Sequence, residues 1–395
     1  MSNYKRLGDY IREVDVRNLE GREDNLLGVS VSKEFIKSVA NTVGTDFTKY
    51  KTVRNTQFTY IPDTSRRGDK IGIAMYANGG TALVSQAYTV FEITDTESLL
   101  PEYLMMWFRR PEFDRYARFR SHGSVREMFD WEELCNTELP IPSPEKQREI
   151  VAEYNAVQRR IDLNNQLIQK LEETAQAIYK QWFVDFEFPN EDGKSYKSSG
   201  GEMVDSELGE IPRGWRVGAL SDIANIIMGQ SPEGESYNSE GNGMIFYQGR
   251  TDFGIRFPDI TTYTTEPKKR AKKGDILMSV RAPVGDLNIT KNDCAIGRGI
   301  ASLNSKTKHN SFLFHLMLAI RNEFDVSNDE GTIFGSITKE ALYQSKIIIP
   351  NNKTIQLFED TISILDKNIE LFAEQDKKLK ELQSLLLSKM ATIKN

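Results

Sequence analysis

Two short patterns in the sequence have the residue types of a catalytic phosphate site. Pro258-Asp259 with Glu266-Pro267-Lys268 carries the letters of a metal-dependent nuclease, whose carboxylates and lysine meet at Mg²⁺ from adjacent strands. Only six residues separate the two halves, however, and Pro267 would disturb a central strand. Gly193-Lys194-Ser195 resembles the end of a phosphate-binding loop, but Phe188 stands in place of its first glycine. We interpret both patterns as chance matches in polar loops.

Methyl transfer and metal chemistry find no better support. A DNA methyltransferase acting alone needs an Asn/Asp-Pro-Pro-aromatic loop, and the sequence contains no Pro-Pro pair. Gly297-Arg298-Gly299 lacks the third glycine of a dinucleotide loop. The three histidines have no cysteine or histidine partners at metal-ligand spacing. We therefore expect no catalytic residue, cofactor or metal in this chain, while a self-contained DNA-modifying enzyme with a divergent site remains the alternative.

Basic residues gather in the stretches 49–70, 109–126 and 268–273. The formal net charge is −6, but nucleic-acid binding depends on how charge is distributed rather than on its sum. Part of the charge in the second stretch should be paired internally, because Glu112 and Asp114 accompany its arginines. The hydrophobic content of 39% and charged content of 27% are those of a soluble globular protein.

Several features favour a cytoplasmic location. The first ten residues lack the apolar core of a signal peptide. The longest apolar stretch, 312–320, is broken by His315 and is too short to span a bilayer. The two cysteines, Cys135 and Cys294, lie far apart and suggest no disulfide framework.

Two long helices are predicted, one after each half of the chain. The first opens at Ser143-Pro144-Glu145, since proline and acidic groups suit a first helical turn. Apolar residues then recur every three or four positions from Ile150 to Trp182, interrupted by Asn164. A helix of roughly 40 residues would be on the order of 60 Å long. The second begins near Asn351 and follows the same rule. Neither can bury a narrow apolar stripe alone, so we expect the two helices to pair.

The segments that precede the helices repeat each other. Leu7 matches Leu220, Arg67-Gly68-Asp69 matches Lys273-Gly274-Asp275, Gly123-Ser124-Val125 matches Gly335-Ser336-Ile337, and Pro142 matches Pro350. Similar residues in the same order, about 210 residues apart each time, indicate a tandem duplication.

The duplication predicts an α+β protein with two globular domains, each followed by a long helix. Two similar halves commonly pack about a pseudo-two-fold axis, which would make the helices an antiparallel coiled coil. Residues 190–201 read as a flexible connector. The predicted boundaries are 1–143, first domain; 144–188, first helix; 189–207, linker; 208–350, second domain; and 351–395, second helix.

This order of elements resembles the specificity subunit of type I restriction-modification systems. The similarity covers the helix opening 142–151, the helix end 177–186, the domain entry 208–215, and the segments 273–281 and 295–300. The resemblance implies two target-recognition domains that read a bipartite, non-palindromic DNA site across a helical spacer. It also implies docking of two modification subunits, which use S-adenosylmethionine, and of restriction subunits, which use ATP and Mg²⁺. A coiled-coil scaffold without DNA binding is a third possibility.

Candidate DNA-reading residues follow from the chemistry of recognition. Arginine suits guanine, asparagine or glutamine suits adenine, and Lys, Arg and Ser suit phosphates. In the first domain the candidates are Lys51, Arg54, Gln57, Arg66, Arg67, Arg120, His122, Ser124 and Arg126. In the second domain they are Gln230, Ser231, Gln248, Arg250, Arg256, Arg281, Arg298 and Ser336. Because the two sets differ, unlike half-sites are expected.

Overall fold

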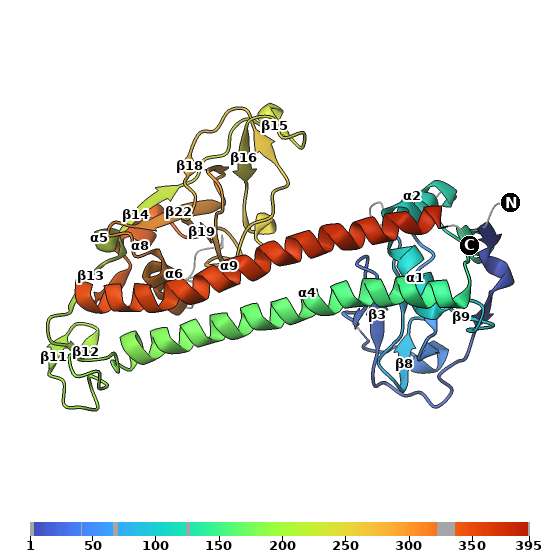
Figure 1. Ribbon diagram of the computed structural model, residues 1–395, viewed down its shortest axis with the longest axis horizontal. Helices are drawn as coiled ribbons and strands as arrows, with labels where there is room; N and C mark the ends of the chain where they lie inside the picture. The colour runs from blue at the N-terminus through green and yellow to red at the C-terminus, as the bar shows by residue number, and fades with distance from the viewer. Residues whose placement is uncertain (1–3, 41, 66–69, 124–126, 322–335, 394–395) are drawn as a thin grey trace. The chain divides into compact units, whose positions relative to one another are not determined.

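The computed structural model describes residues 4–40, 42–65, 70–123, 127–321 and 336–393. It divides the chain into two compact units (Figure 1). The first unit joins Met1–Asn164 to Glu374–Asn395, and the second is Asn165–Ala373. Each unit therefore contains a globular part together with a stretch of both long helices, α4 (Pro144–Tyr179) and α9 (Asn352–Lys389).

The first unit is built around an antiparallel four-stranded sheet in the order β2-β9-β6-β7. Smaller pairs, β1-β10, β3-β4 and β5-β8, surround it. The elements are β1 (Tyr4–Arg6), η1 (Leu7–Asp9), β2 (Ile11–Val14), β3 (Leu27–Val29), β4 (Phe35–Lys37), η2 (Phe47–Lys49), β5 (Lys51–Arg54), β6 (Phe58–Tyr60), β7 (Ile73–Met75), β8 (Thr81–Val84), β9 (Thr89–Ile93), α1 (Pro101–Arg109), α2 (Pro111–Arg120), α3 (Trp131–Cys135) and β10 (Glu138–Pro140).

The core of the first unit lies between this sheet and helix α1. Proline at the first position of α1 suits a helix start, and nearly every later side chain of α1 is buried, as expected for a helix that is apolar all round. Phe58 of β6 stacks on Phe91 of β9 at 5.0 Å between ring centroids and meets Phe108 of α1 edge-on at 5.9 Å. Aromatic packing thus fixes the helix on the sheet.

The second unit contains a four-stranded antiparallel sheet, β14-β22-β19-β20, and a five-stranded sheet, β15-β17-β16-β21-β18. Two further pairs are β11-β12 and β13-β23. The elements are a π-helical turn η3 (Lys180–Val184), β11 (Met203–Ser206), β12 (Gly209–Pro212), β13 (Arg216–Ala219), α5 (Leu220–Ile223), β14 (Ala224–Met228), η4 (Gly234–Ser236), β15 (Tyr237–Asn238), β16 (Met244–Tyr247), η5 (Arg250–Asp252), β17 (Tyr263–Thr264), β18 (Arg270–Ala271), β19 (Ile276–Ser279), β20 (Leu287–Ile289), β21 (Cys294–Ile296), β22 (Ile300–Ser305), α6 (Asn310–Ala319), α8 (Lys339–Gln344) and β23 (Lys346–Ile349); η6 (Met390–Thr392) ends the helix α9 in the first unit.

The strand orders confirm the duplication. In each unit the first strand of the main sheet pairs with the last. The last strand also pairs with a strand from the middle of the domain, and that strand pairs with the one that follows it, giving β2-β9-β6-β7 and β14-β22-β19-β20. Each unit also has an antiparallel strand pair at the equivalent place in the chain, β5-β8 in the first unit and β18-β21 in the second. The two globular parts therefore share one topology, and the predicted α+β class is confirmed.

The sequence repeat matches Gly274 with Gly68, and Gly68 lies outside the described residues. Another residue of the first unit has the hydrogen bond and the backbone conformation of Gly274. The amide of Gly274 donates to Thr290 O at 2.8 Å, and in the first unit the amide of Thr56 donates to Tyr76 O at 2.8 Å. Both turns lead into the third strand of the sheet, and both residues have positive φ. Thr56 is thus the structural counterpart of Gly274. The sequence does not indicate this, because positive φ is typical of glycine and unusual for threonine.

The two long helices pack against each other within each unit, as the heptad pattern predicts. In the first unit Gln158 of α4 accepts a hydrogen bond from Gln383 of α9 at 2.8 Å. In the second unit Tyr179 of α4 meets Phe358 of α9 edge-on at 5.9 Å. Residue numbers fall along α9 as they rise along α4, so the helices run antiparallel. The buried side chains of α4 recur every seven residues, at Tyr154, Ile161, Ile168 and Ala175.

The polar residue in the seam of α4, Asn164, forms hydrogen bonds with side chains of α9. Asn164 is fully buried, and its Nδ2 donates to Asp376 Oδ1 at 2.6 Å and to Gln375 Oε1 at 3.0 Å. Asp376 is 5% exposed. A buried polar pair of this kind can set the register of two helices.

The prediction that 190–201 forms a flexible connector is wrong. Tyr196 in the middle of this segment stacks on Phe188 at 4.6 Å, and Phe188 stacks on Trp215 at 5.0 Å, so the segment packs onto the second unit. The side chain of Asn190 also accepts hydrogen bonds from the amides of Asp192 and Lys194. Glycine and serine content alone suggested flexibility, and aromatic packing overrides it.

None of the helices among the described residues is long and apolar enough to cross a membrane.

We predict that Asn164→Leu lowers the free energy of unfolding by about 2–3 kcal/mol, because the Asp376 carboxylate would stay buried without its donor. The double variant Asn164→Leu/Asp376→Leu should recover at least the stability of the parent, since a purely apolar seam removes the desolvated group. Urea unfolding of both variants measures this. A double variant less stable than Asn164→Leu would contradict the interpretation.

A second prediction concerns His315, which is 2% exposed between the rings of Tyr179 and Phe358. Burial, assisted by the charge of Arg256, lowers the pKa of His315 to about 3. The unfolded chain binds this proton near pH 6.5, so stability should fall as the pH drops from about 6.5 towards 3. Between pH 7 and pH 5 the loss should be about 2 kcal/mol, and His315→Phe should remove it. His122→Gln, at an exposed histidine, is the control; equal pH dependence of all three proteins in urea unfolding would refute the assignment.

Candidate nucleic-acid interface

Three loops of the second unit come together at one surface. They are 229–231, 247–250 and 296–299, and we call them the convergent loops. The amide of Gly297 donates to Tyr247 O at 2.8 Å, and the amide of Arg298 donates to Ser231 Oγ at 3.2 Å. Hydrogen bonds donated by the backbone amides of one loop therefore hold in place loops that are distant in sequence.

Glycines make this close approach possible. A Cβ on Gly229 would lie 2.2 Å from Gly297 O, and a Cβ on Gly299 would lie 2.7 Å from Gln248 O. Neither distance is tolerable for a side chain, and the obstacle in each case is backbone. The glycines between β21 and β22 therefore bring loops of the protein itself together.

The convergent loops expose side chains suited to base and phosphate contact. Gln230, Gln248, Arg250 and Arg298 are all exposed. Arg250 Nε donates to Asp286 Oδ2 at 2.5 Å, which orients its guanidinium. Within the described part of the chain the side chain of Arg298 makes no hydrogen bond or ion pair, so it is free to meet an anionic ligand. Arginine and glutamine are the residues that pair bidentately with guanine and adenine.

Arg281 and Ser336 join the same surface. Their backbones form an antiparallel bridge, and the amide of Val280 donates to Gly299 O at 2.9 Å. Both side chains are exposed. The structure thus brings together all the second-domain candidates except Arg256.

The prediction that Arg256 contacts DNA is corrected by the structure. Arg256 is 4% exposed, and its guanidinium is paired with carboxylates of both long helices. A side chain held in this way cannot reach DNA, so its charge belongs to the scaffold.

In the first unit, two of the candidates are also scaffold residues. Lys51 is 5% exposed, and its Nζ lies 3.8 Å from Glu13 Oε1 and 3.7 Å from Asp15 Oδ1. Gln57 is 8% exposed and donates to Glu92 Oε2 at 2.8 Å. Burial removes both from the set proposed to contact DNA.

The remaining first-unit candidates lie at strand and helix ends. Arg54 is exposed at the end of β5. Arg120, at the end of α2, donates to Glu133 Oε2 at 2.6 Å, and this bond raises the pKa of its guanidinium. His122 is exposed, with Nδ1 2.8 Å from Arg120 O and Nε2 3.6 Å from an oxygen of Asp130. Four candidates lie outside the described residues: Arg66, Arg67, Ser124 and Arg126.

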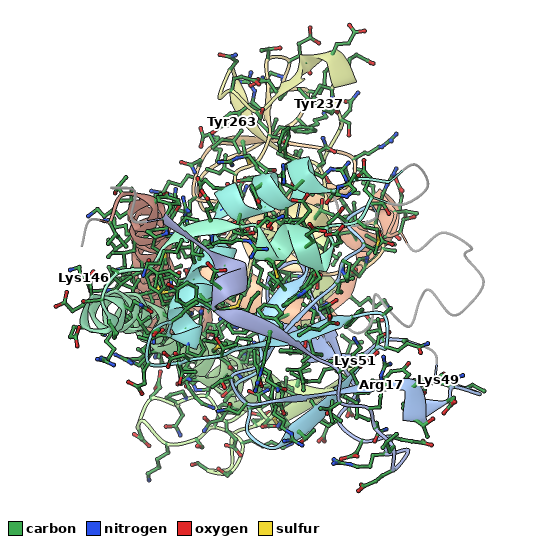
Figure 2. The ribbon with its side chains drawn as sticks, turned by 90° about the vertical axis from the view of Figure 1, so that its right-hand side faces the viewer. Arg17, Lys49, Lys51, Lys146, Tyr237 and Tyr263 are labelled. Carbon is green, nitrogen blue, oxygen red and sulfur yellow. The ribbon has the colours of Figure 1, made fainter. Side chains whose placement is uncertain are left out.

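Folding brings Arg17 next to the start of the basic stretch 49–70, which the sequence did not indicate. The backbone of Arg17 forms an antiparallel bridge with Lys51, and its Nη1 donates to Lys49 O at 2.7 Å. Figure 2 labels these three residues. The hydrogen bond from Arg17, aided by the charge of Lys51, lowers the pKa of Asp15. Arg17 is more than thirty residues from either lysine, so no local pattern could have revealed the contact.

The nuclease-like pattern of Pro258-Asp259 and Glu266-Pro267-Lys268 does not form a metal site. Asp259 and Glu266 are exposed loop residues, and Glu266 lies 3.9 Å from Lys268 in a surface ion pair. Among the residues that the structure describes, no group of three or more His, Cys, Asp or Glu side chains could hold a metal ion.

Comparison with known proteins decides what these surfaces belong to. The family model for the type I restriction modification DNA specificity domain matches residues 29–173 and again residues 212–381. The chain belongs to this family. The two matches coincide with the two copies of the duplicated domain and helix, and the function is that of a specificity subunit, which supplies recognition rather than catalysis.

Relatives and a solved structure agree with this assignment. A putative type I restriction enzyme MjaX specificity subunit of Methanocaldococcus jannaschii is 32% identical over 302 residues, covering 74% of this chain and 68% of the relative. The HindI specificity subunit of Haemophilus influenzae is 24% identical, covering 78% and 80%. The S subunit from M. genitalium has the same fold, with a TM-score of 0.55 at 13% identity and coverage of 99% and 96%.

We predict that Arg298→Ala in this specificity subunit weakens DNA binding of the assembled complex by about 1–3 kcal/mol if the arginine reads a base. If it contacts a phosphate instead, the slope of log K against log salt should fall by about 0.9. Lys353→Ala, at an exposed ion pair on α9, serves as the matched charge-loss control. Fluorescence anisotropy over a salt series distinguishes the outcomes, and equal affinities and slopes for both variants would exclude Arg298 from the interface.

Proposed function

We propose that this specificity subunit reads a bipartite, asymmetric DNA site, one half with each recognition domain. The observation that carries the proposal is a shared scaffold with unlike loops. The main sheets have equivalent strand orders, whereas the loop between β3 and β4 covers residues 30–34 and its counterpart between β16 and β17 covers 248–262. Equal scaffolds with different recognition loops would present different side chains to each half-site.

The division of labour follows the boundaries drawn from the sequence. Residues 1–143 and 208–350 are the proposed recognition domains, 144–188 and 351–395 the spacer helices, and 189–207 the linker. The two helices contain 36 and 38 residues, so each is about 55 Å long at 1.5 Å per residue. A rod of this length can separate two recognition surfaces by a distance comparable to a turn or more of DNA.

In this proposal the chain acts in the cytoplasm as the recognition part of a larger enzyme. Two modification subunits dock on the helix pair and methylate adenine with S-adenosylmethionine, and restriction subunits contribute ATP- and Mg²⁺-dependent chemistry. The exposed apolar side chains Leu357, Ile364 and Leu371 recur every seven residues along α9 and offer a second helical seam for such a partner.

We expect methylome sequencing of cells that express the chain with its modification subunit to show one motif made of two unlike half-sites and a fixed gap. Exchanging residues 221–338 for those of a relative should change one half-site and leave the bases of the other half unchanged. Cells without this chain provide the control. A continuous or palindromic motif would contradict the proposal, and methylation or cleavage by the purified chain alone would favour a self-contained enzyme.

A further inference from the structure

The loop between β16 and β17 carries a buried arginine that connects the second recognition domain to both long helices. Arg256 is 4% exposed. Its carbonyl oxygen accepts a hydrogen bond from the amide of Ile289 at 3.0 Å, so its backbone is attached to β20 of the main sheet. Burial of a guanidinium is costly unless its charge is compensated on all sides.

Compensation comes from three different elements. Arg256 Nη2 lies 2.6 Å from Asp366 Oδ1 on α9, and its Nη1 lies 3.9 Å from Glu172 Oε1 on α4. The guanidinium also covers the ring of Phe314 on α6, 3.7 Å from the ring centre. We call Arg256, Glu172 and Asp366 the arginine clamp.

Neighbouring carboxylates of α9 also contact the second recognition domain. Asp366 Oδ2 accepts from Ser311 Oγ at 2.6 Å, and Glu359 accepts from the amide of Ser311 at 3.2 Å at the start of α6. Lys291 Nζ lies 3.8 Å from Glu370 Oε1. Residues 359, 366 and 370 lie on one face of α9 because their spacings are seven and four. This face therefore carries a row of carboxylates directed at the recognition domain.

We propose that the arginine clamp is a positioning device that fixes where the second recognition domain sits on the helix pair, and so determines the gap between half-sites that the enzyme accepts. This inference rests on the proposed function. A charged contact of this kind ties the domain to one point on the helices, whereas a purely apolar contact could slide. Arg256 itself touches no DNA in this account; it acts through the orientation of the domain that carries it.

The first unit uses its equivalent loop differently. Lys33, between β3 and β4, is 5% exposed and donates to Asp114 Oδ1 on α2 at 2.6 Å. Its Nζ also lies 5.5 Å from the centre of the Phe113 ring. This buried cation holds its loop against a helix of its own recognition domain. The effect on the gap is therefore assigned to the second domain's clamp.

The test must avoid leaving unpaired charges inside the protein. Burial, together with the charge of Asp366, raises the pKa of Glu172, and Arg256 opposes this shift. Removing Arg256 alone would leave two carboxylates in a desolvated place and could unfold the unit. The triple variant Arg256→Met/Glu172→Gln/Asp366→Asn removes all three charges at nearly constant volume. The matched control is Lys346→Met/Glu207→Gln, an exposed ion pair of the same unit.

The experiment uses the assembled modification enzyme and a DNA library. The library keeps the two half-sites of the parent enzyme and varies the gap between them by one base pair at a time. Methylated fractions at each gap are read by sequencing. We expect the parent and the control to prefer one gap. In the triple variant, the ratio of methylation at this gap to methylation at other gaps should fall at least tenfold. The variant should still require the same bases in both half-sites.

Several outcomes would overturn the inference. A triple variant with the parent's gap preference excludes a positioning role, as does an equal loss of methylation at every gap, which is the result of a merely structural role. If circular dichroism shows that the triple variant does not fold, the single variants Glu172→Gln and Asp366→Asn decide, and unchanged gap preference in both rejects the clamp. A parent motif without two half-sites refutes the proposed function instead.

Discussion

The narrow apolar stripe on each long helix is the constraint on which the rest of the molecule depends. Neither α4 nor α9 can exist alone in water with one buried side chain every seven residues, so each must lie against the other. Both compact units consequently contain a stretch of both helices, and each recognition domain is attached to a two-helix element rather than to a single helix. The proposed gap between half-sites depends on this pairing.

Most of the architecture could be predicted from the sequence because it depends on periodic or repeated signals. The heptad spacing of Tyr154, Ile161 and Ile168 predicted the helix pair, and residues repeated about 210 positions apart predicted two similar domains. Composition was a poorer guide. Residues 190–201 look flexible, yet Phe188, Tyr196 and Trp215 pack them into the second unit.

The candidate interface was less predictable because residue type does not reveal burial. Arg256 and Arg298 are both arginines beside glycine-containing loops, but one is enclosed by two carboxylates and a phenyl ring and the other is exposed. The difference comes from tertiary contacts with Glu172 and Asp366, which are distant in sequence. Arg17 was missed for the same reason, since only folding brings it next to Lys49 and Lys51.

The glycines of the convergent loops have a consequence for evolution. At Gly229 and Gly299 any side chain would strike backbone, so selection can change these positions only by rebuilding the surface. The neighbouring Gln230, Gln248 and Arg298 are exposed, and point mutation can replace them without disturbing that backbone. If these exposed residues read DNA as proposed, new DNA preferences can arise one codon at a time on an unchanged framework.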